Sequence, residues 1–311
     1  MCDIVPQNKA FVPAIAAAAL GAALLTSAAR ADLRPEAVPG GVAEIHVAAA
    51  ASPRPEVRFD GRPVLLRQRA DGWHAVVGLP LDTPVGEQTL QVGPEGNSRP
   101  QSFAVGPKAY PEQRLTIKNP KMVTPPAEEL ARIAEERDRQ LAIRSRFRDV
   151  PVSRLDLDLP ADGRLSSRFG LRRIFNGEPR APHTGLDVAV PTGTPIRAPA
   201  DGVVSLVDDL YFNGKTVFVD HGQGFVSMVC HLDKARVEVG QKVARGERLG
   251  DAGSSGRATG DERLDIGSAD HAVLARRLHV RQVDPVVLGE LSDPEDSLPA
   301  QSSTDESAGH F

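Results

Sequence analysis

The chain has 311 residues, of which 41% are hydrophobic and 25% are charged, the ordinary balance of a globular protein long enough for two modest domains. The formal net charge is -4, and the basic residues are interspersed with acidic ones. This distribution excludes a basic surface of the kind that captures the phosphate backbone, so we expect no nucleic-acid partner.

The first 31 residues have the pattern of a signal peptide. Lys9 precedes an uncharged apolar run, and Ala29-Arg30-Ala31 supplies the small-x-small cleavage pattern. We expect cleavage near Ala31, export to the periplasm or the medium, and no stable membrane insertion afterwards. The alternative is an uncleaved anchor, because residues 10–29 could nearly span a bilayer. Cleavage would leave Cys230 as the one cysteine and so no intramolecular disulfide.

Residues 32–110 predict an N-terminal β domain. Short β-prone runs such as "VAEIHV", "WHAVVGL" and "EQTLQV" alternate with turn residues, and Asp-Gly pairs at 60–61 and 71–72 are hairpin signals. This pattern predicts a small antiparallel β-sandwich. Its two histidines, His46 and His74, stand alone on strand patterns, and we interpret them as packing residues.

Residues 111–150 predict an extended linker followed by one helix. The linker is rich in proline and has little periodicity. Thr124 is a candidate cap for the helix, and two prolines fit its first turn. We expect the helix to act as a spacer that packs one face onto a domain. Its apolar stripe consists of Leu130, Ile133, Ala134 and Leu141. Two ion pairs at i,i+4 accompany the stripe, Glu128/Arg132 and Glu135/Arg139.

Residues 151–290 also predict β structure, because glycine turns are frequent and no long helical period is present. The acidic, Ser-rich residues 291–311 are typical of a disordered tail. The predicted fold class is therefore all-β. It comprises an N-terminal β-sandwich-like domain and a C-terminal antiparallel β domain, joined by a Pro-rich segment and one helix.

One histidine and one aspartate in the C-terminal domain have the residue types of a zinc site. His183 and Asp187 flank Gly185, which permits a tight bend that lets both side chains converge. Zinc in hydrolases usually takes three protein ligands and leaves a fourth position open. The spacing by itself is common, so the pair alone is a weak signal.

The surrounding motifs resemble the lysostaphin/LytM-type zinc metallopeptidases, which cut peptide cross-links of bacterial cell walls. These motifs are "RLSSRFGLRR", "HTGLDVAVPTGTPIRAPADGVV", "GKTVFVDHGQGFVSMVCHL" and "VEVGQKVARGERLGDAGSSGRATG". The resemblance implies a lysostaphin-like domain with one zinc ion per chain, and it implies peptidoglycan peptides as substrate. By the same resemblance His183 and Asp187 match two zinc ligands and His231 matches a catalytic histidine. His221, at a hairpin turn, is interpreted as structural.

The last motif departs from the family pattern. Where the family has Pro-His-Leu-His, this chain reads "DERLDIG", so Arg263 replaces the catalytic histidine and Asp265 replaces the third ligand. Asp265 could still bind zinc through its carboxylate, and His271 and His279 are alternative ligands. Residues 261–282 reflect either natural divergence or a sequence error, and the sequence does not distinguish the two.

Three functions follow from these observations. The first is a zinc-dependent metalloendopeptidase, exported and acting on peptidoglycan. The second is a catalytically impaired module that binds the cell wall or regulates other wall hydrolases, because the final motif is degenerate. A structural envelope protein, with neither metal nor wall affinity, is the third.

Overall fold

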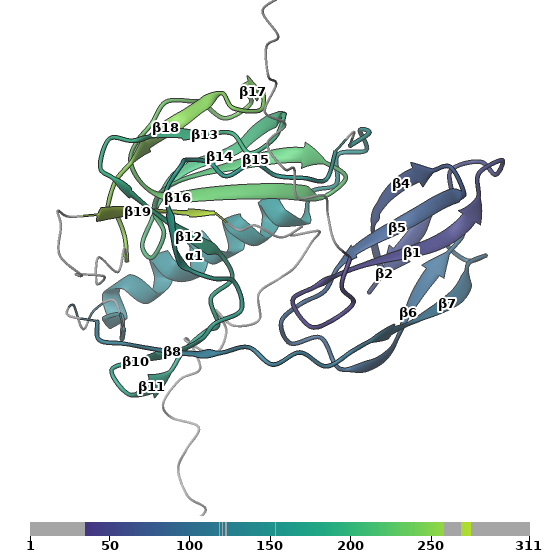
Figure 1. Ribbon diagram of the computed structural model, residues 1–311, viewed down its shortest axis with the longest axis horizontal. Helices are drawn as coiled ribbons and strands as arrows, with labels where there is room; N and C mark the ends of the chain where they lie inside the picture. Colours follow the sequence, from purple (N-terminus) through teal and green to yellow (C-terminus); the bar gives the residue numbers. More distant parts are fainter. Residues whose placement is uncertain are drawn as a thin grey trace, which may run out of the picture. The chain divides into compact units, whose positions relative to one another are not determined.

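The structure is a computed structural model, and it describes residues 35–117, 119, 121, 123–152 and 154–257, together with the backbone of residues 269–274 (Figure 1). The predicted signal peptide, Arg263, Asp265, His279 and the acidic tail lie outside the described residues. His271 falls on a described strand, of which only the backbone is described. The predicted domain boundaries remain predictions.

The N-terminal part of the structure consists of two small antiparallel sheets around one apolar core. One sheet has the order β1 (Val42–Ala49), β5 (Gly72–Gly78), β4 (Leu65–Arg69). The other has the order β3 (Arg62–Pro63), β2 (Val57–Phe59), β6 (Gly86–Val92), β7 (Arg99–Val105). Valine, leucine and alanine side chains from both sheets form a single buried cluster. The predicted β-sandwich is therefore observed.

The first predicted hairpin has the expected turn chemistry. Asp60 and Gly61 connect β2 to β3, and both have positive φ, 48° and 72°. A two-residue turn with positive φ at both positions matches the twist of the flanking strands.

The two histidines of this domain do not stand alone, which corrects the prediction. His46 on β1 is the register partner of His74 on β5, and the two ring centroids are 5.3 Å apart. Nothing in the sequence pattern of either strand gives their mutual register, so the pairing was not predictable.

The linker that was predicted to be extended contains a β-strand. β8 (Glu112–Leu115) pairs in parallel with β10 (Arg172–Phe175), which also pairs with β11 (Glu178–Pro179). The predicted extended conformation is correct for this stretch, but the segment is part of a three-stranded sheet.

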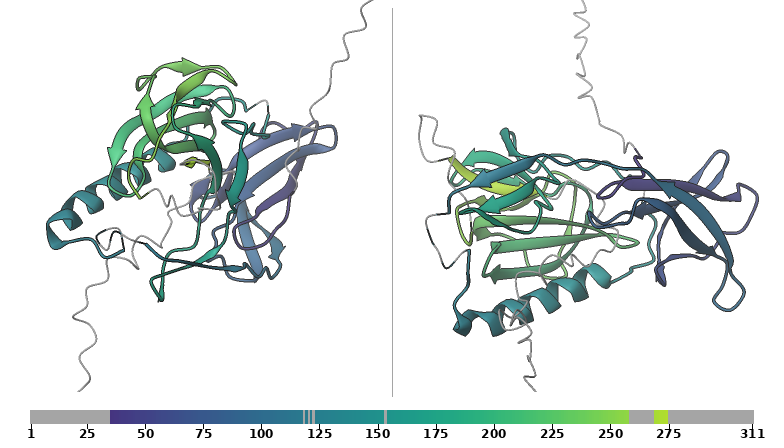
Figure 2. Two further views of the ribbon diagram at one scale, coloured as in Figure 1. Left: turned by 60° about the vertical axis from the view of Figure 1, so that its left-hand side comes forward. Right: turned by 90° about the horizontal axis from the view of Figure 1, so that it is seen from below.

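Helix α1 (Ala127–Ser145) packs one face onto the C-terminal β domain, as predicted (Figure 2). Of the predicted apolar stripe, Ile133 is buried but Leu130 is exposed. The predicted cap is wrong, because Pro126 occupies the N-cap position and no side chain caps the helix. The predicted ion pairs are also replaced: Arg132 binds Glu136 at 2.7 Å, and Arg139 binds Asp208 of a neighbouring strand at 2.9 Å. Arg132 thus pairs with a different i,i+4 neighbour within the helix, and only Arg139 exchanges its predicted i,i+4 partner for a tertiary contact.

The C-terminal β domain is built on a large, mainly antiparallel sheet. Its strand order is β17 (Lys242–Val243), β14 (Gly202–Leu210), β15 (Gly214–Gly222), β16 (Phe225–Ala235), β19 (Ala269–Leu274), β12 (Leu186–Pro191), β9 (Arg164–Ser167). Two further strands, β13 (Pro195–Arg197) and β18 (Arg248–Ala252), pair with each other, and β18 also pairs with β16. The all-β fold class is confirmed.

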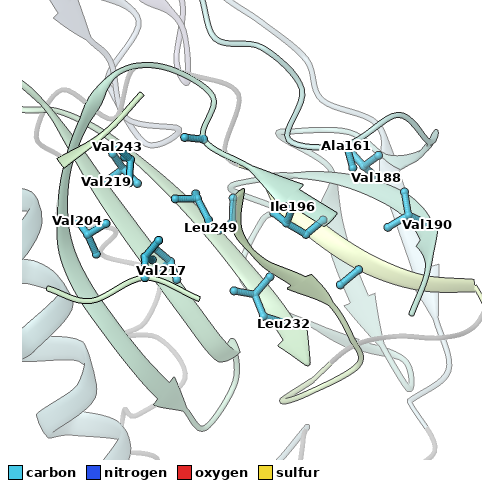
Figure 3. Packing of buried hydrophobic residues seen from close by; sticks show 14 residues of the cluster. Ala161, Val188, Val190, Ile196, Val204, Val217, Val219, Leu232, Val243 and Leu249 are labelled. Carbon is cyan, nitrogen blue, oxygen red and sulfur yellow. The ribbon is translucent and has the colours of Figure 1, made fainter. Parts of the chain in front are cut away.

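The core of this domain is formed by short branched side chains from facing strands (Figure 3). Val188, Val217, Ile196, Leu232 and Leu249 are all fully buried. β-branched residues suit a pleated, buried surface, which explains why valine dominates the strands. This packed core holds β12 and β16 in place, and those two strands carry Asp187 and His231. Within the described part of the chain, no helix is long and apolar enough to cross a membrane.

Candidate metal centre

Sheet register brings the site segments together. Asp187 on β12 is paired on one side with Ser167 of β9 and on the other with position 273 of β19, and Cys230 of β16 is paired with that same position. Neighbouring strands lie about 4.8 Å apart. One cross-strand row therefore brings the start of β12 to within two strand spacings of Cys230 and the adjacent His231, although the two segments are far apart in sequence.

His183 lies just before β12, and backbone hydrogen bonds fix its position. The His183 N–H donates to the carbonyl of Leu171 at 2.8 Å, and the His183 carbonyl accepts from the N–H of Gly170 at 2.7 Å. Gly170 has φ 87°, and a Cβ there would come within 2.1 Å of the Tyr110 ring, so only glycine fits. The bend between His183 and Asp187 is present at Gly185 as predicted.

The ring of His183 is oriented by a second set of contacts. Its Nδ1 lies 3.0 Å from the carbonyl oxygen of Arg168 and 3.0 Å from the hydroxyl of Ser167. A carbonyl can only accept, so Nδ1 carries the proton and donates it. In the neutral ring the lone pair then lies on Nε2, which is the tautomer that a metal ligand requires.

His183 Nε2 faces the carboxylate of Asp187. It lies 3.2 Å from Asp187 Oδ1, and both residues are buried, with 4% and 7% of their surfaces exposed. Oδ1 has no hydrogen-bond partner among the described residues. Two buried acceptor atoms therefore point at each other, an arrangement that requires a proton or a cation between them.

The charge environment keeps Asp187 ionised. Burial alone would raise the pKa of its carboxyl, but His183 and then Arg173 and His231 lower it, and the net shift is downward. The guanidinium of Arg173 lies 3.6 Å from Asp187 Oδ2. The carboxylate is thus held as an anion whose Oδ1 is directed at His183.

This pair fits a zinc ion. Zinc–nitrogen and zinc–oxygen bonds of about 2.0–2.2 Å place two ligands of a tetrahedral site about 3.3 Å apart, close to the separation observed here. The described residues contain no group of three candidate ligands. Of the third-ligand candidates, Asp265 and His279 lie outside the described residues, and His271 is placed on β19 opposite Ala189 by backbone register alone.

His231 is presented by an irregularity in β16. Its φ is 59°, and the β15–β16 register shifts between Lys215 and Val217, opposite this part of the strand. Such bulges re-aim a side chain relative to a regular strand. The His231 Nδ1 lies 2.7 Å from the carbonyl of Ser255, so Nδ1 donates and Nε2 keeps its lone pair.

Two arginines near the site were not singled out by the sequence. Arg173 contacts Asp187 as described, and the guanidinium of Arg257 lies 4.3 Å from the Phe212 ring centroid. Both guanidinium groups also approach one buried ring, that of Phe175. Arg173 is the last residue of the "RLSSRFGLRR" motif, but nothing in that motif indicates which of its arginines faces the site.

His221 has the structural role that the sequence suggested. It is buried, and its Nδ1 donates to the carbonyl of Asp201 at 2.7 Å while its Nε2 lies 2.9 Å from the Ser227 hydroxyl. Burial lowers the pKa of this ring, opposed by its hydrogen bond to Asp201. Both ring nitrogens are thus occupied in the fold.

An antiparallel β domain in which a buried histidine and carboxylate converge, with a second histidine close by, is the framework of a metal-dependent hydrolase. The model of peptidase family M23 matches residues 181–273, and the model of the M23 N-terminal domain matches residues 35–108. A solved M23 peptidase structure from Pseudomonas aeruginosa is 41% identical, with a TM-score of 0.62 over 82% of this chain and 96% of that one. The chain belongs to peptidase family M23.

Curated relatives match less than half of this chain. The peptidoglycan DD-endopeptidase ShyA of Vibrio cholerae is 43% identical over 98 residues, which cover 31% of this chain and 23% of that protein. The DD-carboxypeptidase/endopeptidase Mpg of Neisseria meningitidis is 35% identical over 123 residues, covering 40% and 26%. The chain thus spans about a quarter of the length of these relatives.

Proposed function

We propose that this protein is a zinc-dependent metalloendopeptidase that cleaves peptide cross-links of bacterial peptidoglycan. Membership of family M23 and the names of the curated relatives support the reaction class. The observation that carries the proposal is the buried pair formed by His183 Nε2 and Asp187 Oδ1, 3.2 Å apart, with the histidine proton on the opposite nitrogen.

His183 and Asp187 would hold the zinc ion, with Asp265 as the proposed third ligand. Zinc supplies Lewis-acid chemistry, polarising a peptide carbonyl and making water more acidic. Neighbouring residues keep His183 Nε2 and the Asp187 carboxylate in the protonation state and orientation that a metal ligand needs. The carbonyl of Arg168 holds the His183 proton on Nδ1, and Arg173 keeps Asp187 ionised and oriented.

His231 would assist the reaction from the adjacent strand. Its Nδ1 donates to Ser255, so the opposite nitrogen is the one that can accept a proton or, once protonated, donate a hydrogen bond to a developing oxyanion. The bulge that turns this residue away from regular strand geometry is consistent with a functional placement.

The setting of the reaction is part of the same proposal. The signal-peptide pattern of residues 1–31 supports export to the periplasm or the medium, where peptidoglycan lies, with the uncleaved anchor as the alternative. Other wall hydrolases are further candidate partners. The catalytically impaired module is not favoured, because the curated relatives of this chain are named as endopeptidases.

Digestion of purified peptidoglycan tests the proposal. The full chain should lower the degree of cross-linking and release new amino groups, and both effects should disappear with His183→Ala or with a chelator. His46→Ala, an exposed histidine of the N-terminal domain, is the matched control and should leave digestion unchanged. Wall binding without digestion, insensitive to the chelator, would refute the enzyme and support the binding module.

A further inference from the structure

Tyr110, two residues before β8, lies against the segment that holds the candidate metal ligand His183. Its ring covers Gly170, because a Cβ at that glycine would come within 2.1 Å of two ring carbon atoms. The N–H of Gly170 donates to the His183 carbonyl at 2.7 Å. Gly170 therefore contacts both the Tyr110 ring and the backbone of His183.

The same ring also packs against Phe169. The two ring centroids are 6.2 Å apart and the ring planes are inclined at 73°, the edge-to-face geometry that aromatic pairs prefer. Phe169 follows Arg168, whose carbonyl accepts the Nδ1–H of His183 at 3.0 Å. Tyr110 thus contacts two of the three residues in the segment 168–170, which bonds the imidazole of His183 at its start and the backbone of His183 at its end.

Hydrogen bonds fix Tyr110 over this segment from two sides. Its hydroxyl donates to the carbonyl of Pro39, in the N-terminal β domain, at 2.8 Å. The carbonyl of the next residue, Pro111, accepts from the N–H of Arg172 at 2.9 Å, where β8 runs beside β10 (Figure 1). The backbone end and the hydroxyl end of the tyrosine are therefore both held.

The turn that carries Pro39 is shaped to approach both rings closely. Gly40 has φ 70°, and a Cβ there would lie 2.8 Å from the Phe169 ring and 2.9 Å from the Tyr110 hydroxyl oxygen. Only glycine fits this position without displacing a ring. The N–H of Gly40 donates to the Pro80 carbonyl at 2.6 Å, so the turn itself is anchored in the N-terminal domain.

His183 depends on the segment 168–170 because both lie outside the strands. His183 precedes β12, and residues 168–171 connect β9 to β10. A ligand on irregular backbone is held precisely only where neighbouring side chains are themselves locked by packing and hydrogen bonds. Tyr110 is such a side chain, since its ring is packed and its hydroxyl is bonded.

We infer that Tyr110 is a positioning residue of the candidate metal centre. Its ring keeps the segment 168–170 in the position that holds His183, and its bond to Pro39 makes this position depend on the N-terminal β domain. The inference deepens the proposed function and rests on it, because it concerns the same metal centre. The N-terminal domain thereby contributes to metal binding, although none of its residues is a proposed ligand.

Amide hydrogen exchange tests the inference without metal or turnover. The N–H groups of Gly170 and His183 are the reporters, since their acceptors are the carbonyls of His183 and Leu171. In the metal-free full chain, followed by NMR, Tyr110→Ala should raise both exchange rates at least about tenfold, because the segment opens locally without the ring. Tyr110→Phe keeps the ring and loses the bond to Pro39, so the rise should be about two- to fivefold, the effect of one neutral hydrogen bond.

Zinc affinity is the second readout, measured on the full chain by competition with a chromophoric chelator. Tyr110→Ala should bind zinc roughly tenfold more weakly, the lower end of the usual effect of losing support around a ligand histidine. Tyr110→Phe should restore the affinity to within about threefold of the wild type, because the ring is back in place. A residue that only stabilised the fold would change the free energy of unfolding and leave the zinc affinity of the folded protein unaltered.

Tyr211→Phe is the matched control. Tyr211 is the other tyrosine of the chain, and its hydroxyl also donates to a backbone carbonyl, that of Lys121 at 3.0 Å. This variant loses the same kind of bond elsewhere, so both reporter amides and the zinc affinity should be unchanged. The amide of the buried Val217 on β15 should keep its exchange rate in every variant, which separates local opening from global unfolding. Tyr110→Phe carries the exchange test if Tyr110→Ala does not fold.

Several results would overturn the inference. These are wild-type exchange of both reporter amides in Tyr110→Ala or in Tyr110→Phe, wild-type zinc affinity in Tyr110→Ala, or equal effects in Tyr211→Phe. Absence of zinc from the wild-type protein would refute the proposed function, whereas the exchange rates of Gly170 and His183 would still decide whether Tyr110 holds the segment.

Discussion

The Nε2 atom of His183 and the Oδ1 atom of Asp187 face each other at 3.2 Å in the interior of the C-terminal β domain. The proton of the imidazole is committed to the carbonyl of Arg168 on the far side of the ring. Two acceptor atoms held this way are stable when a cation lies between them, and the local backbone maintains the arrangement through Leu171 and Gly170.

His231 gives the first prediction, because its proposed role is chemical and not metal-binding. His231→Asn should lower the rate of peptidoglycan digestion by about 10²–10⁴-fold, the usual contribution of a general acid–base group, and leave the zinc content unchanged. Asparagine tolerates positive φ and retains a donor for the Ser255 carbonyl, so the bulge should survive. Digestion within about threefold of the wild type would contradict the role, on the same rate scale.

Glu136 gives a prediction about the helix. It is 4% exposed, and its carboxylate accepts hydrogen bonds from Arg132 Nε and from the Tyr211 N–H, each at 2.7 Å. Glu136→Ala should lower the free energy of unfolding by about 1–3 kcal/mol, because it leaves the Tyr211 N–H without its acceptor. The half-exposed Arg132 adds little to this figure.

Urea unfolding measures this change, with Glu135→Ala on the exposed face of the same helix as the control, expected to stay within about 0.5 kcal/mol. Digestion should also slow in Glu136→Ala, because the turn after Tyr211 supplies the Asn213 carbonyl that accepts from the His231 N–H at 2.9 Å. Equal stability of the two variants would show that Glu136 does not brace this turn.

His221 predicts a pH dependence of stability. Burial lowers its pKa in the folded protein, whereas the unfolded chain protonates near the ordinary value of 6.5. Below that pH the unfolded state binds more protons, so the free energy of unfolding should fall as the pH decreases, by at most about 1.4 kcal/mol per pH unit from this residue.

Denaturant unfolding between about pH 7.5 and 5, on either side of the ordinary histidine pKa, isolates this contribution when wild type and His221→Gln are compared. The variant should be less stable at neutral pH and should show a shallower fall with acid. Parallel curves for the two proteins would mean that His221 does not contribute to acid sensitivity.

The sequence predicted best those features that depend on neighbouring residues along the chain, such as strands and turns. Alternating valines and Asp-Gly turns predicted the strands, and the turn at Asp60 has the expected positive φ. The helix was predicted, but its cap was not. Thr124 has the right chemistry for a cap, yet Pro126 occupies that position, because the chain enters the helix through two consecutive prolines.

The site was predictable only in part. Motif resemblance singled out His183, Asp187 and His231, and the structure brings the first two into contact. Arg173 and Arg257 were missed, because their proximity to Asp187 and Phe175 comes from cross-strand register and ring packing. The pairing of His46 with His74 was not predicted, because it also depends on the register between two strands. Long-range register leaves no trace in the spacing of residues along one strand.

Zinc content per chain, measured by mass spectrometry on the purified full-length protein, tests the central claim most directly. The account predicts about one zinc ion per chain, as in single-ion hydrolase sites. His183→Ala should lose that zinc, and His46→Ala should keep it. The coding region for residues 261–282 should be sequenced from the same stock, because the third ligand is proposed there. A folded protein of confirmed sequence that contains no zinc, or zinc that persists in His183→Ala, would contradict the account.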